Sequence, residues 1–182
     1  PSLRFGGLPQ TNFSVFMRPI YKRADARYLY HMQADSRTPI RYVSTPTLSE
    51  LKATAAVGST LWACGSSGTI LVSTNAGATW KPQNSGTTDT LSALQMQDDG
   101  LSGWIAGNNG TLLQTSDGGA TWANRSVLAL QDPLALWFTN GTNGVVVGTD
   151  GFLIHTTNGG TSWSSPNSRT DKAIRSVHFS GD

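Results

Sequence analysis

Three copies of one eight-residue motif contain the residues that could do chemistry in this sequence. They read STNAGATW, TSDGGATW and TTNGGTSW, at Ser73–Trp80, Thr115–Trp122 and Thr156–Trp163. The third position is Asn75, Asp117 or Asn158. A carboxylate there could act as a general acid or base or as a metal ligand, but an amide cannot exchange a proton at neutral pH. Because two of the three copies have the amide, we predict neither catalysis nor metal binding at this position.

The same residue types suit a tight turn. An Asn or Asp oxygen can accept backbone N–H bonds, glycine supplies positive φ, and the tryptophan offers a large apolar face. We therefore predict that each motif fastens a turn. The predicted structural residues are Asn75, Gly77, Thr79, Trp80, Asp117, Gly119, Thr121, Trp122, Asn158, Gly160, Ser162 and Trp163.

The motifs end repeats of 41 to 42 residues, since Trp80, Trp122 and Trp163 are spaced by 42 and 41. A repeat of this length is typical of propellers and solenoids. Each unit alternates short apolar stretches with glycine-rich turns, as in LALWFT, VVVG and FLIHTT, and lacks the 3.6-residue period of a helix. We predict an all-β fold in which each unit is a propeller blade of four short antiparallel strands.

The repeats divide residues 46–182 into three blades and the start of a fourth. The predicted units are 46–86, 87–127, 128–169 and 170–182, and the last contains a first-strand sequence at Ile174–Ser180. Propellers need at least four blades, so we expect an incomplete ring. The sequence is then part of a longer protein, or other chains close the ring.

The motifs resemble the Asp-box, S/T-x-D/N-x-G-x-T/S-W, also called the bacterial neuraminidase repeat. The longer stretch GNNGTLLQTSDGGATW at Gly107–Trp122 resembles the photosystem II assembly and stability factor family. The resemblance covers about residues 46–182. It implies a seven-bladed, non-enzymatic scaffold that grips protein partners, with the Asp-boxes in outer turns away from the binding face.

Residues 1–45 differ from the repeats in charge. They contain seven basic and two acidic residues, whereas the remainder has six basic and nine acidic residues. We predict a basic, aromatic arm that docks onto a protein partner, because Arg and Tyr are enriched at interfaces. Its candidate docking residues are Arg18, Tyr21, Lys22, Arg23, Arg27, Tyr28 and Tyr30. A divergent first blade, with RYLYHM and IRYVS as strands, is the alternative, and nucleic-acid binding is disfavoured.

The composition bounds the remaining function classes. No apolar run approaches the roughly 20 residues of a membrane span, and no secretory signal precedes the repeats, so we expect cytosolic synthesis. Cys64 has Ala106 and Val147 as repeat equivalents, which predicts a buried structural thiol. No cofactor is predicted.

Three functions are consistent with these features. The first is a non-enzymatic scaffold that binds protein partners, or other copies of itself, in a larger assembly. The second is a virion component, such as a tail or capsid appendage, that binds a host-surface glycan. The third is a fragment of a sialidase-like glycoside hydrolase, although the arginine cluster, the Tyr and Glu nucleophile system and the acid of that class cannot be assembled from these residues.

Overall fold

The structure, a computed structural model, describes residues 28–31, 41–44, 46–127 and 131–179. These residues form strands and turns, together with two short 3-10 segments, η1 (Ser66–Gly68) and η2 (Thr149–Gly151). No helix in the described ranges is long and apolar enough to cross a membrane.

Each repeat folds into its own antiparallel sheet, and the sheets are here called blades one, two and three. Blade one consists of β3 (Leu51–Val57), β4 (Thr60–Gly65), β5 (Ile70–Ser73) and β6 (Lys81–Gln83). Blade two consists of β7 (Leu91–Met96), β8 (Gly103–Gly107), β9 (Thr111–Thr115) and β10 (Ala123–Asn124). Blade three consists of β11 (Pro133–Phe138), β12 (Gly144–Gly148) and β13 (Leu153–Thr156).

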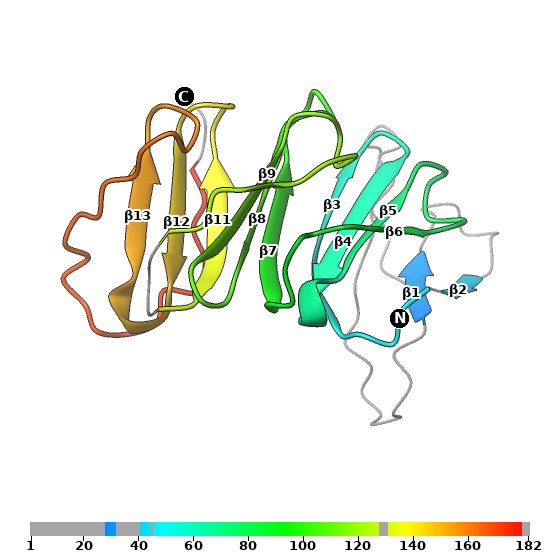
Figure 1. The fold of residues 1–182 in the computed structure, drawn as a ribbon, viewed down its shortest axis with the longest axis horizontal. Coiled ribbons are helices and arrows are strands. Elements are labelled where there is room, and N and C mark those ends of the chain that lie inside the picture. The colour runs from blue at the N-terminus through cyan, green and yellow to red at the C-terminus, as the bar shows by residue number, and fades with distance from the viewer. Residues whose placement is uncertain (1–27, 32–40, 45, 128–130, 180–182) are drawn as a thin grey trace, which may run out of the picture.

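The blades stand side by side (Figure 1), with β7 in contact with both β3 and β11. They pack through their apolar faces. One cluster between blades one and two includes Cys64, Ile70 and Ile105. A second, between blades two and three, includes Trp104 and Phe138. Alternate side chains of a strand point to opposite faces, so the middle blade contributes to both clusters. The predicted all-β propeller is confirmed, and the described sheets do not close into a ring.

Blade three lacks the fourth strand that its repeat predicted. Only one bridge, between His155 and Ser164, follows β13. In blade two the N–H of Arg125 donates to the carbonyl of Leu112 at 2.7 Å, and the repeat places Pro166 at the position of Arg125. Proline has no N–H, so the ladder cannot continue through this residue. The Ser165 hydroxyl donates instead to the Leu153 carbonyl, the repeat equivalent of that of Leu112, at 3.2 Å.

Two further sequence predictions concern the segments that flank the blades. The segments proposed as strands of a divergent first blade form β1 (Tyr28–His31) and β2 (Arg41–Ser44), which pair antiparallel. Whether they belong to an arm or to a blade stays a prediction. The described part of the predicted fourth-unit strand, residues 174–179, belongs to no sheet, because no described strand pairs with it.

Candidate functional site

The first Asp-box closes its turn with a hydroxyl and an amide. The Ser73 hydroxyl accepts the backbone N–H of Gly77 at 2.9 Å and donates to Asn75 Oδ1 at 2.9 Å. That same oxygen accepts the N–H of Thr79 at 2.9 Å, while Asn75 Nδ2 donates to the Thr79 hydroxyl. The third box repeats this pattern, with Asn158 Oδ1 accepting the N–H of Ser162 at 3.0 Å. In both boxes the Asn amide group therefore hydrogen-bonds residues at the start and at the end of the turn.

The second box makes equivalent contacts with a carboxylate. Asp117 Oδ1 accepts the N–H of Thr121 at 2.9 Å and the hydroxyl of Thr115 at 2.8 Å. Here the Thr121 hydroxyl donates to Asp117 Oδ2 at 2.6 Å, whereas its counterpart in the first box accepts from the amide. The hydrogen bond from the Thr121 hydroxyl, reinforced by those from its N–H and from Thr115, lowers the pKa of Asp117 to about 2. A carboxyl group with so low a pKa is a poor general acid near neutral pH.

The boxes also lie at the junctions between blades. Trp62 of blade one donates its indole N–H to the carbonyl of Gly118, in the second box, at 2.9 Å. A Cβ atom on the neighbouring Gly119 would lie 3.0 Å from Trp62 Nε1, and one on Gly160 would contact the Trp104 ring more closely still. Both glycines have positive φ, 85° and 75°. Glycine is therefore needed at these positions for its conformation and for the close approach of the preceding blade.

The tryptophans of the boxes differ in how their indole N–H is satisfied. Trp80 donates to the Gly77 carbonyl of its own turn at 3.1 Å, and Trp122 donates to Gln83 Oε1 of the preceding blade at 3.2 Å. Among the described residues, Trp163 Nε1 is buried and has no acceptor. The repeat places Arg125, which has only donors, where Gln83 stands one blade earlier. The third box therefore lacks the acceptor that the second one has.

The structure brings the predicted box residues together within each turn but not into one shared site. In the described residues, the side chains of Asn75, Asp117 and Asn158 hydrogen-bond only within their own boxes. No group of three His, Cys, Asp or Glu side chains that could hold a metal occurs in the same residues. The prediction for Cys64 is confirmed, since its thiol is fully buried.

The predicted docking residues of the arm lie largely outside the described residues. Arg18, Tyr21, Lys22, Arg23 and Arg27 belong to this group. Tyr28 and Tyr30 lie on β1, where their backbones pair with Ser44 and Tyr42. Their role in docking stays a prediction.

Sequence reasoning missed two side-chain contacts, one between blades two and three and one within the second repeat. The Gln95 side chain of β7 accepts the N–H of Phe138 on β11 at 2.7 Å and donates to its carbonyl at 2.9 Å. Asp89, between blades one and two, accepts from the side chains of Thr111 and Asn109, both at 2.7 Å. These hydrogen bonds, with that from Thr111 the strongest, lower the pKa of Asp89. Because each contact occurs only once among the described blades, no repeated sequence signal could have revealed it.

The repeats match a model of a known protein family. Residues 86–170 match the family model described as photosynthesis system II assembly factor YCF48. The chain is thus an Asp-box β-propeller by both fold and motif. Its predicted resemblance to the photosystem II assembly factor family is confirmed by this match. No curated protein matches the sequence.

Solved structures share the fold. YCF48 from Cyanidioschyzon merolae is 25% identical with a TM-score of 0.59, and the match covers 68% of this chain and 38% of that chain. YCF48 bound to D1 peptide is 20% identical with a TM-score of 0.60, and the match covers 66% and 41%. A GH74 enzyme from Niastella koreensis is 14% identical with a TM-score of 0.59, and the match covers 78% and 28%. This chain therefore spans about two fifths of the length of the two YCF48 structures.

Proposed function

We propose that this chain is a non-catalytic part of a β-propeller scaffold that binds protein partners in a larger assembly. The observation that carries the proposal is the match of residues 86–170 to a family of assembly factors. A solved propeller of the same fold holds a peptide, YCF48 bound to D1 peptide. The likeness to a GH74 enzyme, at 14% identity, extends to the fold alone.

The lowered pKa values and the hydrogen bonds of three carboxyl groups support a binding role over a catalytic one. A glycosidase of the usual kind needs one carboxylic acid that stays protonated near neutral pH, beside a second carboxylate. Hydrogen bonds lower the pKa values of Asp89, Asp99 and Asp117, so none of these three carboxyl groups is suited to be that acid. Each of these groups accepts hydrogen bonds that stabilise a turn or a connection. Its carboxylate oxygens are therefore already engaged in structural contacts.

The basic arm is the docking element that we propose for the partner. Its seven basic residues against two acidic ones contrast with the acidic remainder of the chain. Opposite charge speeds association and selects partners, and buried Arg and Tyr anchors supply affinity. A partner that presents an acidic surface with apolar pockets fits this composition.

Charge reversal in the arm tests the proposal. A photo-crosslinking amino acid is placed at Tyr21 in the whole protein, expressed in its own organism, and the adducts are identified by mass spectrometry. We expect discrete protein adducts that are lost in Arg23→Glu/Arg27→Glu. They should remain in Lys81→Glu/Arg125→Glu, which makes the same change of charge on the outer strand of blade one and directly after that of blade two.

Two results would contradict the proposal. If the adducts persist in the arm variant, or if no adducts form with the unchanged protein, the arm is not the docking element. Turnover of any member of a glycoside panel that includes sialosides would remove the non-catalytic assignment.

A further inference from the structure

Four asparagines of this sequence are followed directly by glycine. They are Asn109, Asn140, Asn143 and Asn158. An Asn–Gly pair is chemically labile, because glycine has no side chain to keep its backbone nitrogen away from the amide carbon of the asparagine. When that nitrogen attacks, the side-chain amide is lost as ammonia. In a folded protein the reaction depends on what holds the attacking nitrogen, the leaving nitrogen and the backbone between them.

In the third Asp-box, hydrogen bonds hold both nitrogens of the pair. Asn158 Nδ2, the leaving group, donates to the Ser162 hydroxyl at 2.9 Å. The N–H of Gly159, which would have to attack, donates to the Thr142 carbonyl at 2.8 Å. This backbone hydrogen bond has to break before the nitrogen can reach Asn158 Cγ. The fold therefore protects the pair.

Two further pairs are restrained by a sheet and by a carboxylate. Gly144 is buried in β12 and is paired with a residue of each neighbouring strand, so its nitrogen cannot turn towards Asn143 while the sheet is intact. Asn109 Nδ2 donates to Asp89 Oδ1 at 2.7 Å, and Gly110 is buried. A hydrogen bond to a charged acceptor is strong, so this leaving group is also held.

The pair Asn140–Gly141 is not restrained in any of these ways. It lies on the hairpin that joins β11 to β12, and both residues are exposed. Among the described residues, neither the N–H of Gly141 nor Asn140 Nδ2 makes a hydrogen bond. A Cβ atom on Gly141 would meet nothing within 4 Å. Both the attacking and the leaving nitrogen are therefore free to move.

The remaining amide atom of Asn140 is its oxygen, and three donors converge on it. Asn140 Oδ1 accepts the N–H of Thr142 at 2.9 Å, the N–H of Asn143 at 2.7 Å and the hydroxyl of Thr142 at 2.9 Å. This oxygen becomes negatively charged when Cγ turns tetrahedral, and donors that are already in place stabilise such a charge. The turn therefore stabilises the intermediate of the attack.

We propose that Asn140 is a site of spontaneous deamidation and that the β11–β12 hairpin promotes the reaction. Hydroxide removes the N–H proton of Gly141, the nitrogen forms a bond to Asn140 Cγ, and the Cγ–Nδ2 bond breaks as the amide takes a proton from water and leaves as ammonia. Water then opens the succinimide ring at one of its two carbonyl carbons. The product is aspartate or isoaspartate at position 140, and the net reaction consumes one water and releases one ammonia.

Blade two shows how the fold accommodates aspartate in such a hairpin. There, Asp99 Oδ1 accepts the N–H of Leu101 and the N–H of Ser102, both at 2.8 Å. These donors lie two and three residues after the acceptor, as they do for Asn140. Aspartate at position 140 therefore fits the same turn and adds one negative charge.

Isoaspartate does not fit this turn, because it routes the backbone through the side chain and lengthens the hairpin by one carbon. The hairpin and the third Asp-box lie at the same end of blade three (Figure 1), where the Thr142 carbonyl accepts the N–H of Gly159. A longer backbone before Thr142 displaces this carbonyl. Isoaspartate at position 140 therefore weakens the third box without changing any of its residues.

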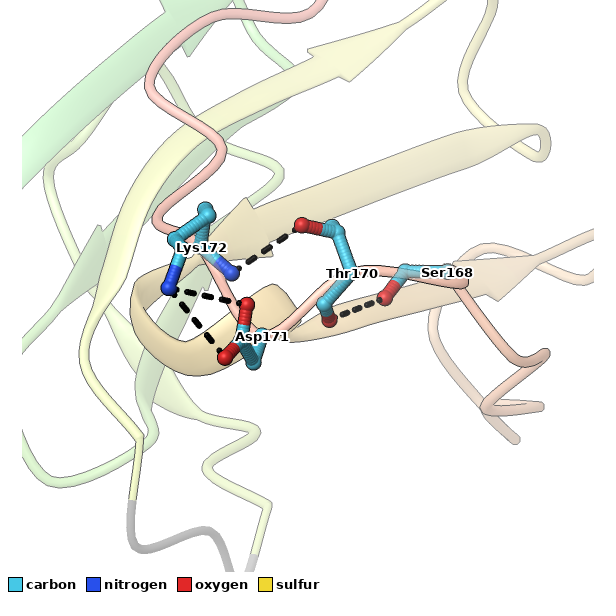
Figure 2. A network of polar contacts seen from close by, with 4 residues as sticks. All are labelled: Ser168, Thr170, Asp171 and Lys172. Atoms are coloured by element: carbon cyan, nitrogen blue, oxygen red, sulfur yellow. Dashed lines mark hydrogen bonds and ion pairs between the residues drawn. The ribbon is translucent and has the colours of Figure 1, made fainter.

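Asn167 is a comparison within the same blade. It is exposed, and its Oδ1 accepts the N–H of Arg169, two residues on, at 2.8 Å. The next residue is Ser168, whose side chain points to the Thr170 carbonyl at 3.2 Å, as Figure 2 shows. The Cβ atom of Ser168 crowds the nitrogen that would attack. We expect Asn167 to react more slowly than Asn140, although both lie in exposed turns of the same kind.

Ageing of the 182-residue chain at mildly alkaline pH tests the proposal. Folded chain and chain unfolded in urea are incubated in parallel, and mass spectrometry of their peptides measures conversion at each asparagine. In the folded chain, Asn140 should react at least about tenfold faster than Asn143 and Asn158, the ratio expected when a hydrogen bond of those pairs has to break first. Asn140 should also react faster in the folded chain than in urea.

Matched substitutions separate promotion by the turn from simple exposure. Thr142→Val removes the hydroxyl that bonds Asn140 Oδ1 and should slow the reaction about two- to tenfold, as expected for one hydrogen bond. Thr139→Val, at an exposed threonine of the same hairpin whose side chain does not bond Asn140, is the control and should leave the rate unchanged. Gly141→Ala should suppress the reaction and keep the fold, because its Cβ atom has open space but shields the nitrogen.

The third Asp-box distinguishes the two products. Asn140→Asp reproduces the direct product and should keep the melting temperature and the slow exchange of the Gly159 amide hydrogen. Aged chain with isoaspartate at position 140, separated by chromatography, should exchange this hydrogen at least about tenfold faster.

Four results would overturn the proposal. One is slower reaction of Asn140 in the folded chain than in urea, and another is an equal rate at Asn140 and Asn167. The third is an equal effect of Thr142→Val and Thr139→Val. The fourth is equally slow exchange at Gly159 in both products. The inference rests on the hairpin alone and is independent of partner binding by the arm.

Discussion

At the scale of single residues, Gly160 combines two requirements that can be measured separately. Its φ is 75°, and a Cβ atom there would contact the Trp104 ring. We expect Gly160→Ala to lower the free energy of unfolding by about 2–4 kcal/mol, from positive φ and overpacking together. Gly58→Ala, with positive φ but open space, should cost about 1 kcal/mol.

Gly141→Ala completes this series as the control. Gly141 has open space and no positive φ, so the change should stay within about 0.5 kcal/mol. Denaturant unfolding of the three variants gives the comparison. Equal losses at Gly160 and Gly58 would show that contact with Trp104 adds nothing.

The carboxylate of the second box makes stability depend on acid pH. Asp117 has a pKa of about 2 in the folded protein, below its ordinary value. A group whose pKa is lowered on folding contributes stability above its unfolded pKa and loses it as pH falls through the folded pKa. We expect Asp117→Asn to lose less stability than the unchanged protein between about pH 4 and pH 2.

The comparison must allow for other acids, because hydrogen bonds also lower the pKa of Asp89 and Asp99. Asp98→Asn removes the same charge from a neighbouring hairpin and serves as the control. Thermal melting at several pH values measures the effect. Identical pH dependence in Asp117→Asn and Asp98→Asn would show that the box carboxylate contributes no acid sensitivity of its own.

At the scale of elements, the junction between blades two and three has an unsatisfied donor that a single substitution can pair. Trp163 Nε1 is buried without an acceptor among the described residues, and Arg125 stands where Gln83 accepts from Trp122. We expect Arg125→Gln to raise the free energy of unfolding by about 1 kcal/mol, since a buried unpaired donor costs about 1–3 kcal/mol. Thermal and denaturant unfolding measure the change.

Lys81→Gln is the matched control for this substitution. It removes a positive charge from the outer strand of blade one and supplies no acceptor to a box tryptophan. If both variants gain equally, the effect comes from charge and not from Trp163.

The sequence predicted those elements that repeat. Three boxes in register defined the turns, and the apolar stretches between them located the strands of all three blades. The repeat pattern predicted a fourth strand in blade three that does not form. Its absence depends on a single position, Pro166, which lacks the backbone N–H that pairs in blade two. The contact of Gln95 with Phe138 was also beyond prediction, since it depends on how two neighbouring blades face each other.

At the scale of the whole molecule, an array of repeats distributes its stability by position. Each blade contacts only its neighbours, so a blade covered on both sides gains two interfaces. Blade two is covered by blades one and three, whereas Leu153 on blade three is only partly buried. We expect amide hydrogens at Ile105 and Leu113 to exchange most slowly, and those of β13 at least about tenfold faster.

Hydrogen exchange followed by NMR tests this gradient. Uniform protection across the three blades would show that they open as one cooperative unit. Protection that rises towards blade three would contradict the expected order.

The reaction of the single thiol can report how often blades one and two separate. Cys64 lies at the first junction with its sulfur 3.8 Å from the Leu91 carbonyl oxygen, and burial raises its pKa to about 12. Only a thiolate that reaches solvent reacts with a disulfide reagent, so labelling must wait until blades one and two separate. At a reagent concentration high enough that labelling outpaces reclosing, the labelling rate equals the rate of these separations, and substitutions at the far end of the array should leave it unchanged unless the blades open together.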